Sequence, residues 1–248
     1  MTYKQEQITP YGNEGSKREQ VEQMFDNIAH SYDTLNHTLS FGIDHQWRKA
    51  AMRHLLHSGH HIDSVLDIAT GTGDFALLAH RMLHPQHIVG CDISQGMMDI
   101  GTEKVKKAGL ADTISFQYED CGQMSFDDNS FDAVISAFAL RNFQSLDQCL
   151  AEMYRVTKPG GQLAVVDLCT PVTFPMKQLF YIYKKVVMPA LGRFVSHDST
   201  AYSYLPQTMD AVPQAEVMQA IIAKAGFANT AFRRLPFGMC ILYTGEKE

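Results

Sequence analysis

The stretch from Val65 to Phe75 constrains the fold of this chain more than any other. It begins with Val65-Leu66-Asp67-Ile68, a short apolar run with β-branched residues that predicts a buried strand. It then passes through Gly71-Thr72-Gly73 into an apolar run from Phe75 that is typical of a helix. A strand, a tight glycine turn and a helix bring backbone N–H groups close to a small molecule. The stretch therefore predicts a ligand site.

Strand and helix patterns alternate after this loop. Further strands are expected at 88–91, 113–118, 131–136 and 163–168, with helices at 74–82, 94–107 and 145–156. The turn Lys158-Pro159-Gly160-Gly161 separates the last helix from the last of these strands. Strands spaced by helices in this way predict βαβ units and a parallel sheet. Two final strands, at 230–235 and 239–244, are expected to form an antiparallel hairpin.

The remaining segments complete one predicted domain over 1–248. Residues 1–15 are polar and are expected to form a loose tail. Residues 16–61 are expected to hold a helix to residue 29, an ordered polar loop over 32–42 and a helix over 44–57. The ligand-binding core covers 62–170. An aromatic helical cap is expected over 171–210, with Pro189 and Pro206 as breaks, followed over 211–248 by a helix from Val212 and the hairpin.

Composition excludes some classes of protein. The net charge of −6 argues against general nucleic-acid binding, which needs a basic face. No window is apolar over the length of a membrane span, and the polar start of the chain does not resemble a signal peptide. The five cysteines are widely spaced and form no C-x-x-C pair, as expected for buried free thiols in a reducing compartment. A cytoplasmic protein is predicted.

The glycine loop fits two kinds of nucleotide. Gly71 to Ala76 matches the dinucleotide pattern G-x-G-x-x-G/A, and Asp92 follows Gly73 by 19 residues, where an acidic residue binds a ribose diol. Asp74 in the first helical turn and Asp67 at the end of the strand would repel a pyrophosphate. S-adenosylmethionine, which has a sulfonium and no phosphate, suits the loop better than NAD. In the plainer alternative, Asp67 and Asp74 only cap backbone amides.

Two further groups fit a nucleoside ligand. Asp120-Cys121 follows the third strand, where a carboxylate can meet an adenine amino group, although a surface turn explains the pair equally. Met97 and Met98 follow the helix cap Ser94, and one of them is a candidate to cover the adenine, unless both are plain core.

These residues resemble those of class I S-adenosylmethionine-dependent methyltransferases. Two stretches narrow the resemblance to the quinone-biosynthesis C-methyltransferases: Tyr32-Asp33-Thr34-Leu35-Asn36 through Ser40-Phe41-Gly42 to Trp47-Arg48, and Arg155 through Gly161. Leu140-Arg141-Asn142 also matches. The similarity runs from about Phe25 to the C-terminus. The family is that of the demethylmenaquinone methyltransferases, with the 2-polyprenyl-6-methoxy-benzoquinol methylases as close relatives.

The resemblance implies a doubly wound seven-stranded sheet, mostly parallel with a C-terminal antiparallel hairpin. It places Thr72, Asp92 and Asp120-Cys121 on cofactor-binding positions. Together with the loop residues Asp67, Gly71 and Gly73, they form the predicted cofactor site. The chain departs from the family pattern at Leu35, where Met is usual, at Cys121, where Ala is usual, and at Ala137, where some relatives have Ser. None of these changes removes a charged group.

The implied reaction is methyl transfer to a ring carbon of a reduced naphthoquinol. Arg141 and Asn142 follow the fourth strand, at the sheet edge where ligands bind, and Arg141 is expected to stabilise a developing phenolate unless it only forms a salt bridge. Tyr32 is the third catalytic candidate, with packing as its alternative. His37 and His45 are further polar candidates, and no general base is evident. The aromatic cap is expected to cover an isoprenoid tail.

Several alternatives stay open. If the chain belongs to the ubiquinone branch of the family, its substrate is a benzoquinol. Two other classes of protein also stay open: an NAD-dependent oxidoreductase, and a methyltransferase-like domain that only binds a ligand. His54, His57 and His61 share a helical face but lack a carboxylate or thiol, so no metal site is predicted. Expected partners are the polyprenylated quinol and, transiently, the inner membrane face. A homodimer is left open.

Overall fold

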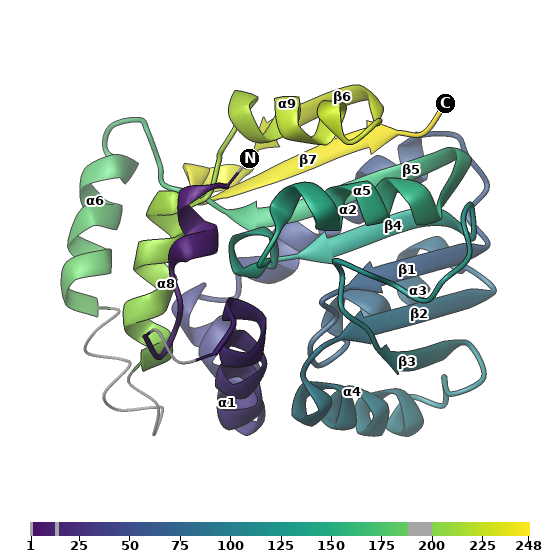
Figure 1. The fold of residues 1–248 in the computed structure, drawn as a ribbon, viewed down its shortest axis with the longest axis horizontal. Coiled ribbons are helices and arrows are strands. Elements are labelled where there is room, and N and C mark those ends of the chain that lie inside the picture. The colour runs from purple at the N-terminus through teal and green to yellow at the C-terminus, as the bar shows by residue number, and fades with distance from the viewer. Residues whose placement is uncertain (1, 13–14, 188–199) are drawn as a thin grey trace.

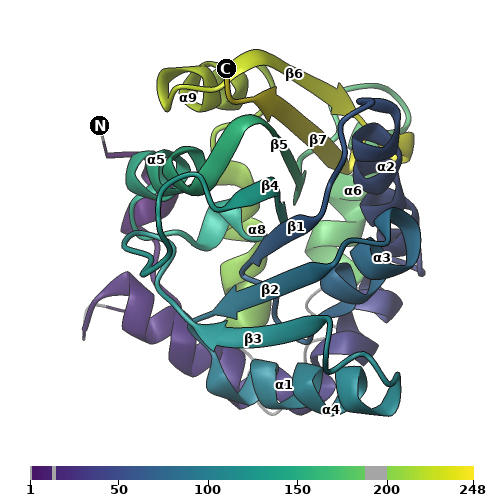
Figure 2. The same ribbon diagram turned by 90° about the vertical axis from the view of Figure 1, so that its right-hand side faces the viewer.

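A computed structural model describes residues 2–12, 15–187 and 200–248. Its centre is a seven-stranded sheet in the order β3-β2-β1-β4-β5-β7-β6 (Figure 2). The strands are β1 (Ser64–Ile68), β2 (His87–Asp92), β3 (Ile114–Tyr118), β4 (Phe131–Ala137), β5 (Thr157–Leu168), β6 (Ala228–Arg234) and β7 (Cys240–Glu246). The first five are parallel, and β7 runs antiparallel to both of its neighbours. The predicted sheet and hairpin are confirmed.

Helices cover both faces of the sheet, which explains why its central strands are apolar throughout. α2 (Asp44–His57) and α3 (Asp74–Leu83) lie on one face, and α5 (Leu146–Val156) and α9 (Glu216–Lys224) on the other (Figure 2). Each face has its own buried core: Met52 and Phe75 belong to one, Leu150 and Met218 to the other. α4 (Gln95–Lys107) packs beside β3 and against α1 (Lys17–Leu39).

The strand order reverses at β1. β1 pairs with β2 on one side and with β4 on the other; α3 connects β1 to β2, and the chain reaches β4 only after β3. In doubly wound sheets, ligands bind outside the carboxyl ends of the strands at this reversal point. The loop after β1 is the predicted glycine turn, so the fold places it where a ligand site is expected.

α1 is longer than the sequence predicts. Its first turn is capped by Ser16 and Glu19 as a capping box, but the helix continues to Leu39 through the segment expected to be a loop. The polar residues of that segment find partners on other elements. Asp33, for example, accepts a hydrogen bond from the Thr72 hydroxyl at 2.6 Å. Such tertiary partners offset the weak helix propensity of Asp and Asn.

The N-terminal residues also differ from the expected loose tail. Lys4–Gln7 form a short 3-10 helix, η1, and the Gln5 side chain is buried. The Glu6 carboxylate accepts a hydrogen bond from the backbone N–H of Leu146 at 2.8 Å, which caps the start of α5. The buried Lys17 ammonium donates to the carbonyl oxygens of Gln5 and, at 3.0 Å, of Arg141. These polar contacts fix a segment that has few apolar residues.

The cap and the C-terminal half show smaller differences. The cap holds α6 (Met176–Ile182), a π-helical turn over Tyr183–Val187, and α8 (Thr200–Ala211), which contains Pro206 instead of breaking there. Pro189 and Phe194 lie outside the described residues. β5 begins at Thr157, so the Pro-Gly-Gly turn lies inside the strand, and α9 begins at Glu216, after the predicted start.

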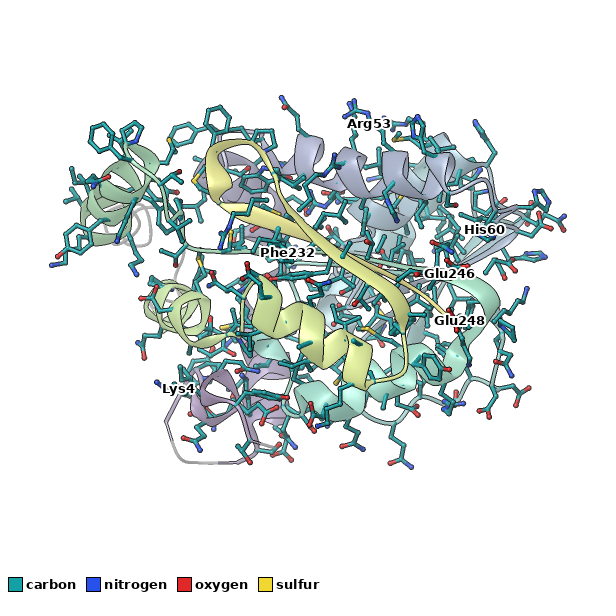
Figure 3. All side chains as sticks on the ribbon, turned by 90° about the horizontal axis from the view of Figure 1, so that it is seen from above. Lys4, Arg53, His60, Phe232, Glu246 and Glu248 are labelled. Atoms are coloured by element: carbon teal, nitrogen blue, oxygen red, sulfur yellow. The ribbon has the colours of Figure 1, made fainter. Side chains whose placement is uncertain are left out.

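Figure 3 shows the β6–β7 hairpin from outside, with Phe232 on β6 and Glu246 on β7. His60 lies near the carboxyl end of β7, 3.8 Å from the Glu246 carboxylate between Nε2 and Oε1. This end of the hairpin is thus fixed to the connection between α2 and β1.

Candidate active site

The glycine turn is shaped by contacts that exclude side chains. Gly71 and Gly73 have φ of 56° and 78°, in the region that favours glycine. A Cβ on Gly73 would lie 2.8 Å from the Phe116 ring. The glycine therefore lets the turn pack directly on the Phe116 ring of β3, and Gly71 of the same turn lines a cavity. Nearby, Ala69 and Phe138 also have positive φ, of 54° and 64°, and such backbone strain concentrates at functional sites.

Asp92, at the end of β2, connects this turn to α4. Its Oδ2 accepts a hydrogen bond from the Gly71 N–H at 2.8 Å, and its Oδ1 accepts one from the Ser94 N–H at 2.9 Å. Burial raises the pKa of Asp92, and backbone hydrogen bonds from Ser94, Gly71 and Ile93 oppose that shift. Because an ionised carboxylate has about four acceptor positions, acceptor capacity remains for a ligand.

A cavity of about 300 Å³ lies over the carboxyl ends of β1 to β4, and we call it the main cavity. α1 closes it from outside with Val21, Phe25 and Tyr32. Six of the predicted site residues line it: Tyr32, Gly71, Asp92, Asp120, Cys121 and Asn142. Met97 lines it as well, whereas Met98 is buried elsewhere in the core. The fold thus brings these residues, which are distant in the sequence, to one cavity.

The main cavity is acidic. Asp92, Glu119 and Asp120 line it, and Arg18 is the one cation among its lining residues. Arg18 is already paired, because its Nε lies 2.8 Å from Oδ2 of Asp120. Sequence reasoning missed Glu119 and Arg18. Glu119 directly follows β3 and could have been found from that position, whereas Arg18 comes from the first turn of α1 and carries no local signal.

Asp67 and Asp74, on which the charge argument was built, do not line the main cavity. Asp67 is 1% exposed and accepts a hydrogen bond from the Thr70 hydroxyl at 2.7 Å. Burial raises the pKa of Asp67 to about 7. Asp74 pairs with Lys104 at 2.7 Å. The carboxylates that face the ligand space are those named above.

Asp74 belongs to a charge network outside the main cavity, which we call the outer network. Lys104 of α4 is its centre, and it contacts Asp33, Asp74 and the Thr72 hydroxyl. Nε2 of His37 lies 3.7 Å from Asp74. The network connects the end of α1 to the glycine turn. The Thr72 hydroxyl, which the resemblance had placed on the cofactor, contacts Asp33 and Lys104 of this network. Thr72 and Gly73 do not line the main cavity.

Arg141 and Asn142 lie in the 3-10 turn η2 (Leu140–Asn142) after β4. Nη1 of Arg141 is 3.0 Å from Oδ1 of the buried Asp167, so the predicted salt bridge is present. Two atoms here are buried and have no hydrogen-bond partner among the described residues: Nε of Arg141 and Oδ1 of Asn142. Buried polar atoms without partners are rare, and a ligand is one way to satisfy them.

Two smaller cavities extend the site away from the glycine turn. The first, the bridging cavity of about 60 Å³, shares Tyr32 and Asn142 with the main cavity. The second, the cap cavity of about 80 Å³, shares Asn36, Leu39 and Arg141 with the bridging cavity. Their other walls come largely from apolar residues of α1, α2, α6 and α8. The three cavities therefore adjoin one another in a row, with Asn142 between the first two and Arg141 between the last two.

Tyr32 stands where the main and bridging cavities meet, and burial raises its pKa. His45 stacks on His37, with ring centroids 4.5 Å apart. Among the described residues, the group His37, Asp44 and His45 has the spacing of metal ligands, whereas the group His54, His57 and His61 does not. Asp44 also pairs with Arg48, and a cation at that position disfavours a metal.

Solved structures with this fold define the class of protein. The chain is similar to phosphoethanolamine N-methyltransferase 2 of Haemonchus contortus, solved in complex with S-adenosyl-L-methionine, with TM-score 0.65 and 16% identity over 94% of this chain and 60% of that one. It is also similar to an S-adenosylmethionine-dependent methyltransferase from Aquifex aeolicus, with TM-score 0.55 and 19% identity over 79% and 88% of the two chains. The architecture is that of class I methyltransferases.

Sequence comparison places the chain within this class. Residues 13–247 match the model of the ubiE/COQ5 methyltransferase family, and the chain belongs to that family. It is 57% identical to a demethylmenaquinone methyltransferase of Bacteroides fragilis over the full length of both proteins. It is 43% identical to a demethylmenaquinone methyltransferase of Porphyromonas gingivalis over 98% of each. The family predicted from the signature stretches is confirmed.

Proposed function

We propose that this chain transfers the methyl group of S-adenosyl-L-methionine to a ring carbon of demethylmenaquinol and so produces menaquinol. The observation that carries the proposal is the 57% identity, over both full lengths, with a relative named demethylmenaquinone methyltransferase. The acidic main cavity and its apolar extension supply the matching geometry. The chain is an enzyme of the S-adenosyl-L-methionine-dependent class.

The main cavity fits this cofactor better than a phosphorylated one. S-adenosyl-L-methionine carries a sulfonium and an ammonium, which three lining carboxylates attract, whereas a pyrophosphate would meet repulsion from the same groups. Asp92 lines the main cavity, and its carboxylate suits the hydroxyls of a ribose. We expect Asp120, beside Cys121, to contact the adenine end. Tyr32 covers the same space from α1.

The residues beyond the main cavity suit the quinol ring. S-adenosyl-L-methionine, when bound, supplies a methyl group activated by the sulfonium charge. We expect Arg141 Nε to donate a hydrogen bond to a ring oxygen, which stabilises the phenolate as the hydroxyl proton leaves. Asn142, exposed to both cavities, positions the ring so that its ortho carbon faces the methyl group. The new C–C bond forms as the C–S bond breaks, and the ring carbon then loses its proton.

A benzoquinol substrate is the second candidate, because a relative from Geotalea daltonii, 40% identical over 93% of this chain, is named ubiquinone/menaquinone biosynthesis C-methyltransferase. The deciding experiment incubates the enzyme with labelled S-adenosyl-L-methionine and each reduced quinone separately, and identifies the product by mass. Methylation of the naphthoquinol is the expected result. Methylation of the benzoquinol alone would contradict the proposed substrate, and tighter binding of NADH than of S-adenosyl-L-methionine would contradict the proposed cofactor.

A further inference from the structure

Exposed apolar side chains gather on one helix of the cap. Of twelve large apolar residues that are clearly exposed in the described chain, seven lie in residues 172–186 or touch them. We call the following set the α6 face: Phe41, Phe174, Leu179, Tyr181, Ile182 and Val186. Phe41 joins it through the Tyr183 ring, with centroids 6.4 Å apart. In Figure 1, α6 stands at one end of the molecule, beyond α8.

The other side of α6 faces the site. Phe180 is buried, and both Phe180 and Tyr183 line the cap cavity. The Tyr183 hydroxyl donates a hydrogen bond to the carbonyl oxygen of Leu39 at 2.7 Å, which fixes the helix to the end of α1. α6 is therefore apolar on two sides. The side with Phe180 is buried in the protein. The side with Leu179 and Ile182 is exposed, and no described residue covers it.

The charge of this segment is opposite to that of the whole protein. Residues 172–186 contain Lys177, Lys184 and Lys185 and no Asp or Glu, although the chain carries a net charge of −6. Lys184 pairs with Asp210 at 2.5 Å. Lys185 lies over the Tyr181 ring at 4.5 Å, and Lys177 is exposed. Exposed apolar residues flanked by lysines are typical of helices that lie in the interface of an anionic bilayer.

The size of the cap cavity adds a second argument, which rests on the proposed function. Pockets that enclose drug-sized ligands hold about 300–1,000 Å³, whereas the cap cavity holds about 80 Å³. It cannot enclose a polyprenyl tail. A ring bound near Arg141 would leave its tail outside this cavity, whose wall is formed in part by Phe180 of α6, the helix that also carries the exposed Leu179 and Ile182.

We propose that the α6 face docks on an anionic lipid bilayer. The ring of the quinol then enters the cap cavity past Phe180 and Tyr183, while its isoprenoid tail stays in the lipid. Leu179, Ile182 and Val186 insert among the acyl chains, and Lys177 and Lys185 meet the phosphate groups of the headgroups.

Vesicle binding tests this proposal directly. The probe is a vesicle of phosphatidylcholine with phosphatidylglycerol, and the readout is cosedimentation. We expect Leu179→Ser with Ile182→Ser to weaken binding by about tenfold or more, because two side chains lose the transfer of apolar area into lipid. Leu56→Ser with Val217→Ser is the matched control, since these residues lie on α2 and α9 with similar exposure (49% and 58%, against 55% and 56%). Lys177→Gln with Lys185→Gln is expected to reduce binding mainly at low salt.

Activity separates this proposal from the proposed function. The α6 variant is expected to lose turnover of a long-tailed quinol in vesicles and to keep turnover of a tail-less naphthoquinol in solution. If wild type methylates neither quinol, the proposed function fails. If wild type methylates both and the variant binds vesicles as wild type does, the docking proposal fails. It also fails if wild type is a dimer by ultracentrifugation and the variant a monomer, because a second copy then covers the face.

Discussion

The main cavity and the outer network lie on opposite sides of one glycine turn, and both are rich in carboxylates. In the outer network each carboxylate meets a cation: Lys104 lies within 3 Å of both Asp33 and Asp74. In the main cavity, Asp92 and Glu119 have no ion pair with any described residue, and Asp120 shares Arg18 with Glu22. The comparison shows that a carboxylate near a ligand loop predicts a cationic ligand only when no protein cation already neutralises that carboxylate.

The largest effect is expected where a compensated carboxylate loses its cation. Arg141→Met leaves the buried Asp167 without its partner, and breaking a buried ion pair costs about 3–5 kcal/mol of unfolding free energy. Chemical denaturation measures the loss. Lys224→Met is the control, because its pair with Asp147 is exposed and is worth at most about 1 kcal/mol. Turnover of the folded variant should fall more than its cofactor affinity, and full activity would remove Arg141 from the site.

The next effect concerns a carboxylate without a protein cation. Asp92→Ala should weaken S-adenosyl-L-methionine binding by about a hundredfold, since two charge-assisted hydrogen bonds to the ribose are lost at about 1.5 kcal/mol or more each. Calorimetry measures this affinity. Asp99→Ala, an exposed carboxylate on α4, should bind the cofactor as wild type does. Unchanged affinity in the Asp92 variant would refute its ribose contact.

A third prediction uses pH. The folded protein holds the pKa of Asp67 at about 7 against an ordinary 3.8, because burial disfavours its charge. The folded state thus binds more protons than the unfolded state between these values, so this residue makes stability fall as pH rises through that window. Asp67→Asn should remove that contribution, and its unfolding free energy should gain about 4 kcal/mol relative to wild type between about pH 4 and 8.

Chemical denaturation of both proteins at about pH 4 and about pH 8 measures their unfolding free energies and checks this prediction. Equal pH dependence of the unfolding free energy in wild type and the Asp67 variant would contradict it. Asp63→Asn, which changes a partly exposed carboxylate just before the same strand, provides the comparison.

The contrast between the two regions also explains what the sequence could predict. Strand, turn and helix patterns are local, so the sheet and the position of Asp92 followed from a few neighbouring residues. The pairing of Asp74 with Lys104, 30 positions later, depends on how α3 and α4 pack and leaves no local signal. For the same reason the polar residues Asp33 and His37 were assigned to a loop. Their partners on other elements stabilise them within α1. The η1 contact of Glu6 was missed because its partner, Leu146, is 140 positions away in the chain.

The smallest effect is the sharpest test of the comparison. Asp74→Asn removes a charge one residue after the glycine turn, yet we expect less than about a threefold change in S-adenosyl-L-methionine affinity, because Lys104 already compensates that charge. The cost in stability should be about 0.5–1 kcal/mol, as for other partly exposed pairs. Calorimetry measures the cofactor affinity of the Asp74 variant and of the Asp92 variant under the same conditions. A change in affinity as large as that of Asp92→Ala would mean that the outer network, and not the acidic wall of the main cavity, selects a cationic cofactor.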